Sequence, residues 1–352
     1  MEGRRWTELL EKGDRNMRIN FLLLARWTTR VLLCLIVGGL STAAAITTDN
    51  EKIGPEKKPA EHLGEKYKTD YFDNFYGITS GDPANIWIVG NSGRILHSPD
   101  NGKNWIVQKS GARENLYSVS FIDARRGWCA GGNGLILHTE DGGASWVRQT
   151  TGTENPIFGI QFLSKQVGFA CGYSGLFLRT SDGGKTWENK SYGKDVILRG
   201  MSFLNEKTGV IVGEFGTIFR TVDGGSTFSR PASPVTNTLF SVHFSDGKSG
   251  YASGMDGSLI ATSDGGRTWR KEDSGTKEHL IGIFSNGQFA VAVGLRGAVE
   301  VKESAGKWVA IDVKTLNWLS GVYVGKEMKG LIVGAHGTML RLEDLIPKGK
   351  EN

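Results

Sequence analysis

Five aspartates and two further acids are the side chains of this 352-residue chain best suited to chemistry. The five aspartates recur in a short motif that reads TSDGGKTW in its clearest copies, and a degraded copy ends at Trp308. The motif holds Asp100, Asp141, Asp182, Asp223 and Asp264, and ends at Trp105, Trp146, Trp187, Phe228 and Trp269. Glycoside hydrolysis needs two carboxylates roughly 5 to 9.5 Å apart. Because the five aspartates recur, we interpret them as structural, which leaves Glu214 and Asp256 as the non-repeating acidic pair.

Histidine and cysteine positions predict neither a metal nor a cofactor. His97 and His138 occupy one repeated position that holds arginine in other repeats, and no zinc-type spacing of Cys and His occurs. Cys129 and Cys171 stand one position apart in neighbouring repeats. Packed sheets lie about 10 Å apart, whereas bridged Cα atoms seldom exceed ~7 Å. This favours buried thiols and leaves a disulfide as the alternative.

A repeat of 40 or 41 residues organises the chain from about residue 71. Its marker is a Gly-x-x-Gly turn between apolar runs, at Gly90/Gly93, Gly131/Gly134, Gly172/Gly175, Gly213/Gly216, Gly254/Gly257, Gly294/Gly297 and Gly334/Gly337. Each unit has four short runs rich in β-branched and aromatic residues, such as 116–123, 127–132, 134–141 and 146–151. Seven four-stranded units of this length predict an all-β, seven-bladed β-propeller over residues 71–346.

The first run of each unit also carries a small residue, at Gly77, Ser118, Gly159, Gly200, Ser241, Gly282 and Gly321. Small side chains suit strands that crowd around an axis, so this run is predicted to be the innermost strand. The last unit lacks a fourth run, because a short tail containing Pro347 follows Arg341. We therefore expect an N-terminal strand from about residues 62–72 to close the ring, and a tail at 347–352.

The N-terminus predicts export. Residues 31–46 are apolar, follow Arg26 and Arg30, and contain the small-residue sequence Ala43–Ala45. We expect residues 1–46 to be either a signal peptide cleaved near Ala45 or a membrane anchor, with the body in a periplasm or an equivalent lumen. Residues 47–70 are polar and predicted to be a linker.

Charge argues against nucleic-acid binding. The net charge is +5, but residues 1–45 carry +3 of it, so the body is close to neutral. A near-neutral body lacks the clustered cations that phosphate binding needs.

Residues that depart from the repeat are the candidates for binding. The central residues of the turns differ from unit to unit and are predicted to share one rim. Arg199 stands out at a strand-one position otherwise filled by Tyr, Phe, Ile or Ser. The candidate partner-binding residues are Arg113, Tyr173, Arg199, Glu214, Phe215, Asp256, Arg296 and His336. Solvated turns around a single extended arginine are the alternative.

The combination of a GW-x-x-G strand, G-x-x-G-x-I-L-x-T and D-G-G-x-T-W at a 41-residue period resembles the photosystem II stability/assembly factor family, over residues 75–344. The resemblance implies an exported, non-catalytic propeller that escorts newly made reaction-centre subunits. The motif itself, an Asp box, also resembles those of sialidases, xyloglucan hydrolases and sortilin-type receptors.

Two functions follow for comparison. The first is a monomeric scaffold or assembly factor without a cofactor, which binds a segment of a membrane protein at the rim. The second is an Asp-box glycoside hydrolase or a carbohydrate-binding propeller that uses Glu214 and Asp256.

Overall fold

The computed structural model describes residues 67–191, 195–303 and 306–345. The predicted signal or anchor at 1–46, linker residues 47–66 and the tail at 347–352 lie outside the described residues. Within the described part of the chain, no helix is both long and apolar enough to cross a bilayer.

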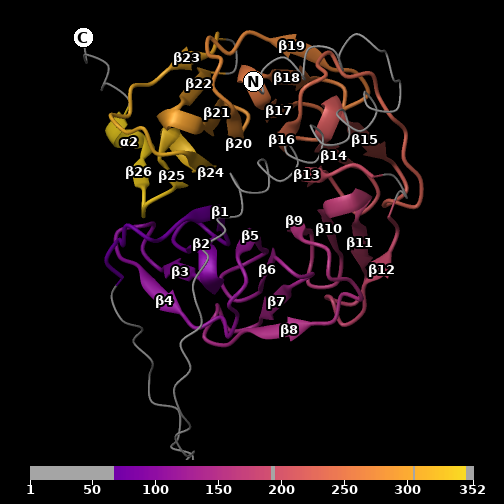
Figure 1. Cartoon of the computed structure of the whole chain (residues 1–352), viewed down its shortest axis with the longest axis vertical. Helices are drawn as coiled ribbons and strands as arrows, with labels where there is room; N and C mark the ends of the chain where they lie inside the picture. The colour runs from indigo at the N-terminus through magenta and orange to yellow at the C-terminus, as the bar shows by residue number, and fades with distance from the viewer. Residues whose placement is uncertain (1–66, 192–194, 304–305, 346–352) are drawn as a thin grey trace, which may run out of the picture. The chain divides into compact units, whose positions relative to one another are not determined.

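Seven antiparallel sheets follow one another along the chain (Figure 1). Blade 1 comprises β1 (Phe75–Ser80), β2 (Ile86–Gly90), β3 (Ile95–Ser98) and β4 (Ile106–Gln108); blade 2, β5 (Leu116–Phe121), β6 (Gly127–Gly131), β7 (Ile136–Thr139) and β8 (Val147–Gln149); blade 3, β9 (Ile157–Phe162), β10 (Gly168–Gly172), β11 (Phe177–Thr180) and β12 (Glu188–Asn189). Blade 4 comprises β13 (Leu198–Phe203), β14 (Gly209–Gly213) and β15 (Ile218–Thr221); blade 5, β16 (Leu239–Phe244), β17 (Gly250–Gly254), β18 (Leu259–Thr262) and β19 (Arg270–Glu272). Blade 6 comprises β20 (Leu280–Ser285), β21 (Phe289–Gly294), β22 (Val299–Glu303) and β23 (Val309–Ala310); blade 7, β24 (Leu319–Val324), β25 (Gly330–Gly334) and β26 (Met339–Arg341), followed by α2 (Leu342–Leu345). The seven-bladed prediction is confirmed.

The first strand of every blade lies innermost, as its small residue predicts. Each of these strands contacts the first strand of the next blade, and β24 contacts β1, which closes the ring. A Cβ added to Gly77 would lie 3.1 Å from the carbonyl oxygen of Tyr117 on the neighbouring inner strand. A small side chain is therefore needed for the inner strands to approach.

A β-bulge interrupts the first strand of all seven blades. In blade 1 the register with β2 shifts between Phe75 and Gly77, and in blade 4 the register with β14 shifts between Leu198 and Gly200. The bulged residues are Tyr76, Tyr117, Phe158, Arg199, Phe240, Ile281 and Ser320. Bulges re-aim side chains and are frequent beside functional sites. This position coincides with the variable strand-one position of the sequence.

Two blades depart from the four-stranded pattern. In blade 4 the outer strand is reduced to one bridge between Arg220 and Ser229. Pro231 and Pro234 follow, and proline cannot donate a ladder hydrogen bond. Blade 7 has three strands in the described residues.

The predicted N-terminal closing strand is not found where it can be examined. Residues 62–66 of that segment lie outside the described residues, and residues 67–72 form no strand. Tyr67 instead donates its backbone N–H to the carbonyl of Trp105, and α2 packs against β25 and β26. The ring closes through its inner strands and its turns.

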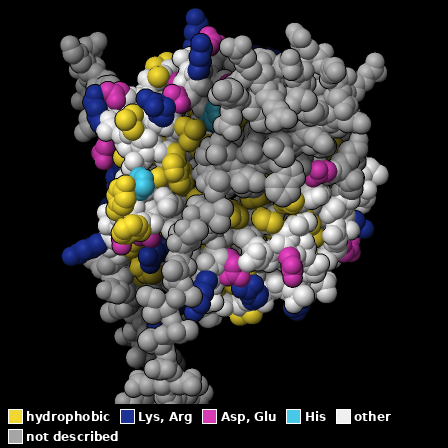
Figure 2. Space-filling model, in the orientation of Figure 1, with side chains coloured by type: hydrophobic (Ala, Val, Ile, Leu, Met, Phe, Trp, Pro, Cys, Tyr) yellow, Lys and Arg dark blue, Asp and Glu magenta, His cyan; other side chains and the backbone are white. Residues whose placement is uncertain are grey.

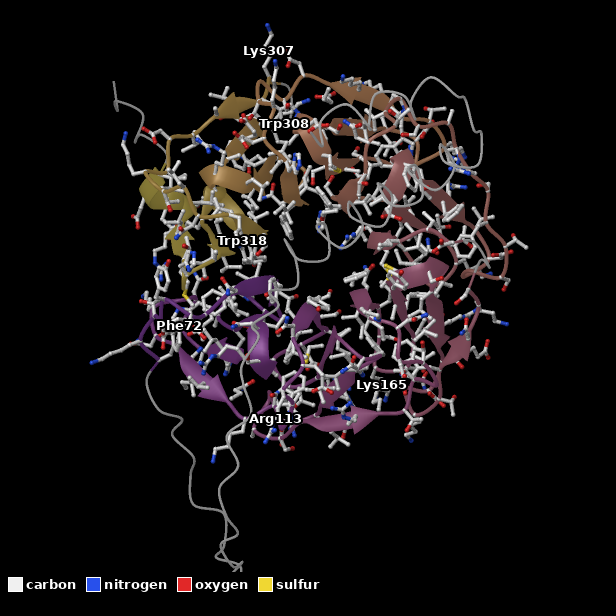
Figure 3. All side chains as sticks on the ribbon, in the orientation of Figure 1. Phe72, Arg113, Lys165, Lys307, Trp308 and Trp318 are labelled. Atoms are coloured by element: carbon white, nitrogen blue, oxygen red, sulfur yellow. The ribbon has the colours of Figure 1, made fainter. Side chains whose placement is uncertain are left out.

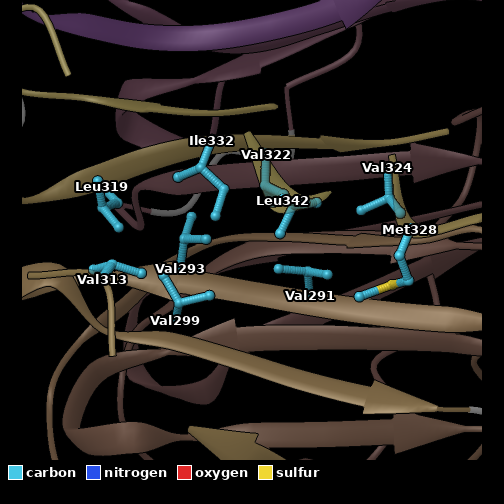
Figure 4. Packing of buried hydrophobic residues seen from close by; sticks show 10 residues of the cluster. All are labelled: Val291, Val293, Val299, Val313, Leu319, Val322, Val324, Met328, Ile332 and Leu342. Atoms are coloured by element: carbon cyan, nitrogen blue, oxygen red, sulfur yellow. The ribbon is translucent and has the colours of Figure 1, made fainter. Parts of the chain in front are cut away.

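Hydrophobic clusters fill the spaces between neighbouring blades. Figure 4 shows the cluster between blades 6 and 7, where Val291 and Val293 of β21 face Val322 and Ile332 of blade 7. The second strand of a blade is buried on both faces, as in β6, because a blade lies on each side of it. Apolar burial stabilises by roughly 25 cal/mol per Å².

Cys129 and Cys171 are free, buried thiols. Burial raises the pKa of Cys171 to about 12. They pack as small hydrophobes in two different clusters between blades, so the disulfide alternative is wrong.

Candidate protein-binding rim

The hairpin turns and the loops between successive blades form one rim, called here the turn rim. In each turn the last central residue and the second glycine have positive φ, as at Ser92 (52°) and Gly93 (70°). Two residues of positive φ give the type I′ turn that matches the twist of a hairpin. Gly93 donates its N–H to the carbonyl of Glu114 in the loop before blade 2, and Asn91 donates to Asn74 before blade 1. Each turn is thus fixed to two loops.

The first glycine of the turn serves a different purpose from the second. Gly90 has an extended backbone, with φ of −157°. A Cβ at this position would lie 2.4 Å from the carbonyl oxygen of Asn74. The first glycine is therefore required for close approach of the loop and not for its φ.

Phe215 is the most unusual residue on the turn rim. Its φ is 56°, a left-handed conformation that a bulky side chain rarely adopts, and its side chain is 60% exposed. Residues held in such a conformation cost roughly 1–3 kcal/mol and cluster at functional sites. Phe215 therefore combines backbone strain with an exposed apolar ring.

The bulged residues of blades 1–4 form a continuous series, called here the aromatic arc. Trp318 stacks on Tyr76 with ring centroids 5.7 Å apart, and Tyr76 lies 5.6 Å from Tyr117. Tyr117 lies 5.4 Å from Phe158, and the guanidinium carbon of Arg199 lies 4.7 Å from the centre of the Phe158 ring. The arc therefore pairs apolar surface with one cation at its end. Arg199 itself is buried.

The remaining predicted partner-binding residues are unequally accessible. Glu214 is buried, and its carboxylate accepts the backbone N–H of Ile197 at 3.0 Å. It therefore offers little surface to a partner. Tyr173 is half-buried in the turn of blade 3. Arg113 is exposed in the loop between β4 and β5 (Figure 3), two blades away from Arg199.

Asp256, Arg296 and His336 occupy equivalent positions in the turns of blades 5, 6 and 7, each with positive φ. Asp256 lies 3.5 Å from Nδ1 of His279, and Arg296 lies 3.3 Å from the carboxylate of Glu278. Asp256 is thus joined to the loop before the next blade, and Arg296 to the loop before its own blade. Both pairs leave the turn residues exposed but partnered.

The Asp boxes lie at the opposite ends of the strands. In blade 3, Asp182 accepts hydrogen bonds from the Thr180 hydroxyl at 2.8 Å, and from the backbone N–H and hydroxyl of Thr186 at 2.9 and 2.6 Å. The hydroxyl and the N–H of Thr186 are the main causes that lower the pKa of Asp182 to about 2. The same bonds recur around Asp141, Asp223 and Asp264.

Each box also contacts the preceding blade. The carbonyl of Gly183 accepts hydrogen bonds from the indole of Trp128 and the amide of Gln149, both in blade 2. The indole of Trp187 in turn donates to Gln149 at 3.2 Å. The motif therefore recurs because its hydrogen bonds join each blade to the preceding one.

The repeated histidines are polar strand residues in contact with tryptophans. His97 stacks on Trp87 and His138 on Trp128, with centroids 4.5 and 4.6 Å apart. Burial lowers the pKa of His97 to about 4. No group of three His, Cys, Asp or Glu side chains that would hold a metal occurs among the described residues.

Sequence reasoning missed several rim residues. Tyr71 and Phe72 are 67% and 78% exposed in the loop before β1, a segment that was expected to be a strand. Trp318 was also missed, because it lies two residues before the variable position. The sequence signal that could have identified Tyr71 and Phe72 is the pair of adjacent aromatic residues directly after a polar segment.

Seven blades, Asp boxes on one rim and a non-repeating rim opposite define an Asp-box β-propeller. The model of the family described as "Photosynthesis system II assembly factor YCF48" matches residues 50–140 and 143–232, just over half of the chain. The chain belongs to this family. Comparison with curated protein sequences gives no match.

Solved structures show the same fold. A structure described as "YCF48 bound to D1 peptide" is 19% identical with a TM-score of 0.66, and covers 79% of this chain and 96% of its own. YCF48 from Cyanidioschyzon merolae is 18% identical with a TM-score of 0.65, over 79% and 98%. A GH74 xyloglucanase from Xanthomonas campestris is 12% identical with a TM-score of 0.68, over 81% of this chain and 54% of its own.

Proposed function

We propose that this protein is a non-catalytic assembly factor of photosystem II that binds a segment of a membrane protein across the turn rim. Membership of an assembly-factor family and the D1 peptide bound to one similar propeller support the proposal. The observation that carries it is the aromatic arc, in which non-repeating residues of successive blades contact one another and end at Arg199.

The chemistry of the arc suits an extended peptide. Tyr and Trp supply large apolar area at a low cost in side-chain entropy, and aromatic residues with arginine dominate binding energy at protein interfaces. An apolar stretch would contact the half-buried Tyr117 and Phe158, and an acidic group would approach the end of the arc, where the buried Arg199 lies against Phe158. The exposed Phe215 of blade 4 extends the surface beyond Arg199.

Binding of tiled D1 peptides to the full chain, measured by fluorescence anisotropy, tests the proposal. We expect at least one peptide to bind, and Arg199→Gln to weaken its affinity about tenfold or more. Lys185→Gln, which removes an exposed cation from an Asp-box turn, is the control and should have no effect. Equal losses in both variants, or no peptide bound, would contradict the proposal.

The two acids of the glycoside hydrolase alternative differ in accessibility. Glu214 is buried against the backbone of Ile197, whereas Asp256 is exposed and paired with His279. The likeness to a xyloglucanase at 12% identity concerns the fold. Release of a chromogenic group from a glycan panel, abolished by Glu214→Gln, would favour the alternative.

We also propose that the propeller lies outside the cytoplasm. The apolar residues 31–46 and the preceding arginines support this location. Protease treatment of intact cells and of opened compartments is the test. We expect protease added from outside the cytoplasm to digest the chain. A chain that is digested only after the cytoplasm is opened would contradict the proposal.

A further inference from the structure

An exposed aromatic cluster lies where the last blade meets the first. It consists of Tyr71 and Phe72, in the loop before β1, and His336, in the turn of blade 7, and is called here the seam patch. The Tyr71 ring stacks on His336 with centroids 4.2 Å apart and an interplanar angle of 12°. On the face shown in Figure 2, hydrophobic side chains gather over this part of the ring.

Hydrogen bonds from both blades hold the seam patch in its exposed position. His336 Nδ1 lies 3.0 Å from the carbonyl oxygen of Tyr71. The amide of Asn91, in the turn of blade 1, donates to the carbonyl of Phe72 at 3.0 Å, and Asp70 accepts the N–H of Phe72 at 3.0 Å. Single exposed apolar residues are common, but here Tyr71 stacks on His336, Phe72 meets Tyr71 edge-on at 5.8 Å, and hydrogen bonds hold the backbone of both residues. Fixing them before binding reduces the entropy lost on association.

The seam patch is continuous with the aromatic arc. Tyr76, the first bulged residue, lies in the same segment as Phe72 and stacks on Trp318. The carbonyl of Trp318 accepts the N–H of Ala335, the residue before His336. Figure 3 labels Phe72 and Trp318 on the two sides of this seam, with Trp318 nearer the middle of the ring. One extended segment can therefore cross both surfaces.

The charges beside the seam patch favour an apolar occupant. Arg94 lies next to it and is paired with the buried Asp73 at 2.9 Å. Asp73 also accepts the Tyr67 hydroxyl at 2.6 Å. A lipid surface rich in anionic headgroups is recognised by clusters of available cations, whereas this arginine is neutralised locally.

We propose that the seam patch binds an uncharged apolar stretch of the same partner segment, with an aromatic or aliphatic side chain packed on Tyr71 and Phe72. The inference rests on the proposed function and adds a second contact to it. The aromatic arc binds one part of the partner segment, and the seam patch binds the adjoining part, which lies farther from the middle of the ring. A partner peptide must then contain apolar residues on one side of its acidic group.

The double variant Tyr71→Ser/Phe72→Ser tests the seam patch in the full chain. Both side chains are exposed, so the thermal midpoint should not change. Affinity for the D1 peptide that binds the wild type should fall about tenfold or more. The control is Val147→Ser/Val309→Ser, which removes two exposed apolar side chains from the outer strands β8 and β23 and should leave affinity unchanged.

The outcomes separate the two proposals. Failure of the wild type to bind any D1 peptide overturns the proposed function, and the seam patch with it. Binding by the double variant that equals the wild type overturns the seam patch alone. Flotation with phosphatidylglycerol vesicles distinguishes the lipid alternative, because loss of flotation with unchanged peptide affinity would make lipid the occupant.

Discussion

The backbone N–H of Gly337, in the turn of blade 7, donates to the carbonyl oxygen of Asp73 before blade 1 at 2.7 Å. The same bond joins Gly93 to Glu114 and Gly216 to Asn237. The chain ends are therefore joined by the contact that joins neighbouring blades elsewhere. The carboxylate of Asp73 adds bonds to Tyr67 and Arg94 at this junction.

Replacement of Asp73 should loosen the loop before blade 1, although the backbone bond to Gly337 remains. Asp73→Ala leaves Arg94 and the Tyr67 hydroxyl without their buried partner, so the free energy of unfolding should fall by about 2 kcal/mol. Urea denaturation measures the change. The exposed pair Arg296–Glu278 provides the control, because Glu278→Gln should cost less than about 0.5 kcal/mol. Equal effects would mean that Asp73 contributes no more than a surface ion pair.

Glu300 should make the protein less stable as pH rises. It is 2% exposed on β22, its Oε2 has no hydrogen-bond partner among the described residues, and burial raises its pKa to about 7. The carboxyl is neutral in both folded and unfolded chains below its ordinary pKa near 4.5, so its cost appears between pH 4.5 and 7. Glu300→Gln should therefore stabilise the protein by up to about 3 kcal/mol at pH 8 and not at pH 4.

Thermal unfolding at both pH values measures the effect of Glu300. Glu303→Gln, at an exposed position on the same strand, is the control. A gain for Glu300→Gln that is equal at pH 4 and pH 8 would show that burial in the fold does not raise the pKa of this carboxyl.

The contribution of the Asp boxes to the stability of the fold should be lost in acid. Because the folded pKa of Asp182 is about 2, its stabilising contribution is complete above its ordinary value of 3.8 and is lost as pH falls through 2. Asp182→Asn should lower the thermal midpoint at pH 6, and the difference from the wild type should shrink towards pH 2. A difference that does not change with pH would contradict hydrogen bonding to the ionised carboxylate.

Replacement of Phe215 should stabilise the protein and weaken peptide binding. Asn tolerates left-handed backbone better than Phe, so Phe215→Asn should raise the free energy of unfolding by about 0.5–1 kcal/mol. The same variant removes an exposed ring from the turn rim and should weaken peptide binding. A variant that is less stable than the wild type would show that Phe215 packs as a structural residue.

The repeat in the sequence determined most of the fold. Each repeated sequence feature corresponds to one repeated contact between or within blades. These features are the turn glycines, the small residue at Gly77 and its equivalents, and the Asp boxes. The bulge at Arg199 was visible only as a variable position, because register shifts leave no fixed residue type. The closing strand expected at about residues 62–72 is absent from residues 67–72, and its earlier part lies outside the described residues. A short last unit does not say which contact replaces a missing strand.

Candidate binding residues were harder to predict, because exposure depends on the packing of loops. Glu214 and Phe215 are neighbours in one turn, yet the first is buried and the second is exposed. The turn gives the first central residue an inward direction and the second an outward one. Tyr71 and Phe72 were assigned to a strand because the last unit lacks a fourth run, which we expected the N-terminal segment to supply.

Hydrogen exchange of the full chain, with and without a bound D1 peptide, tests most directly whether the turn rim is the binding surface. The account predicts slower exchange in residues 71–76, 109–117 and 213–217, and unchanged exchange in the Asp-box residues 139–146 and 180–187. Protection confined to the Asp-box side, with the turns unaffected, would contradict it.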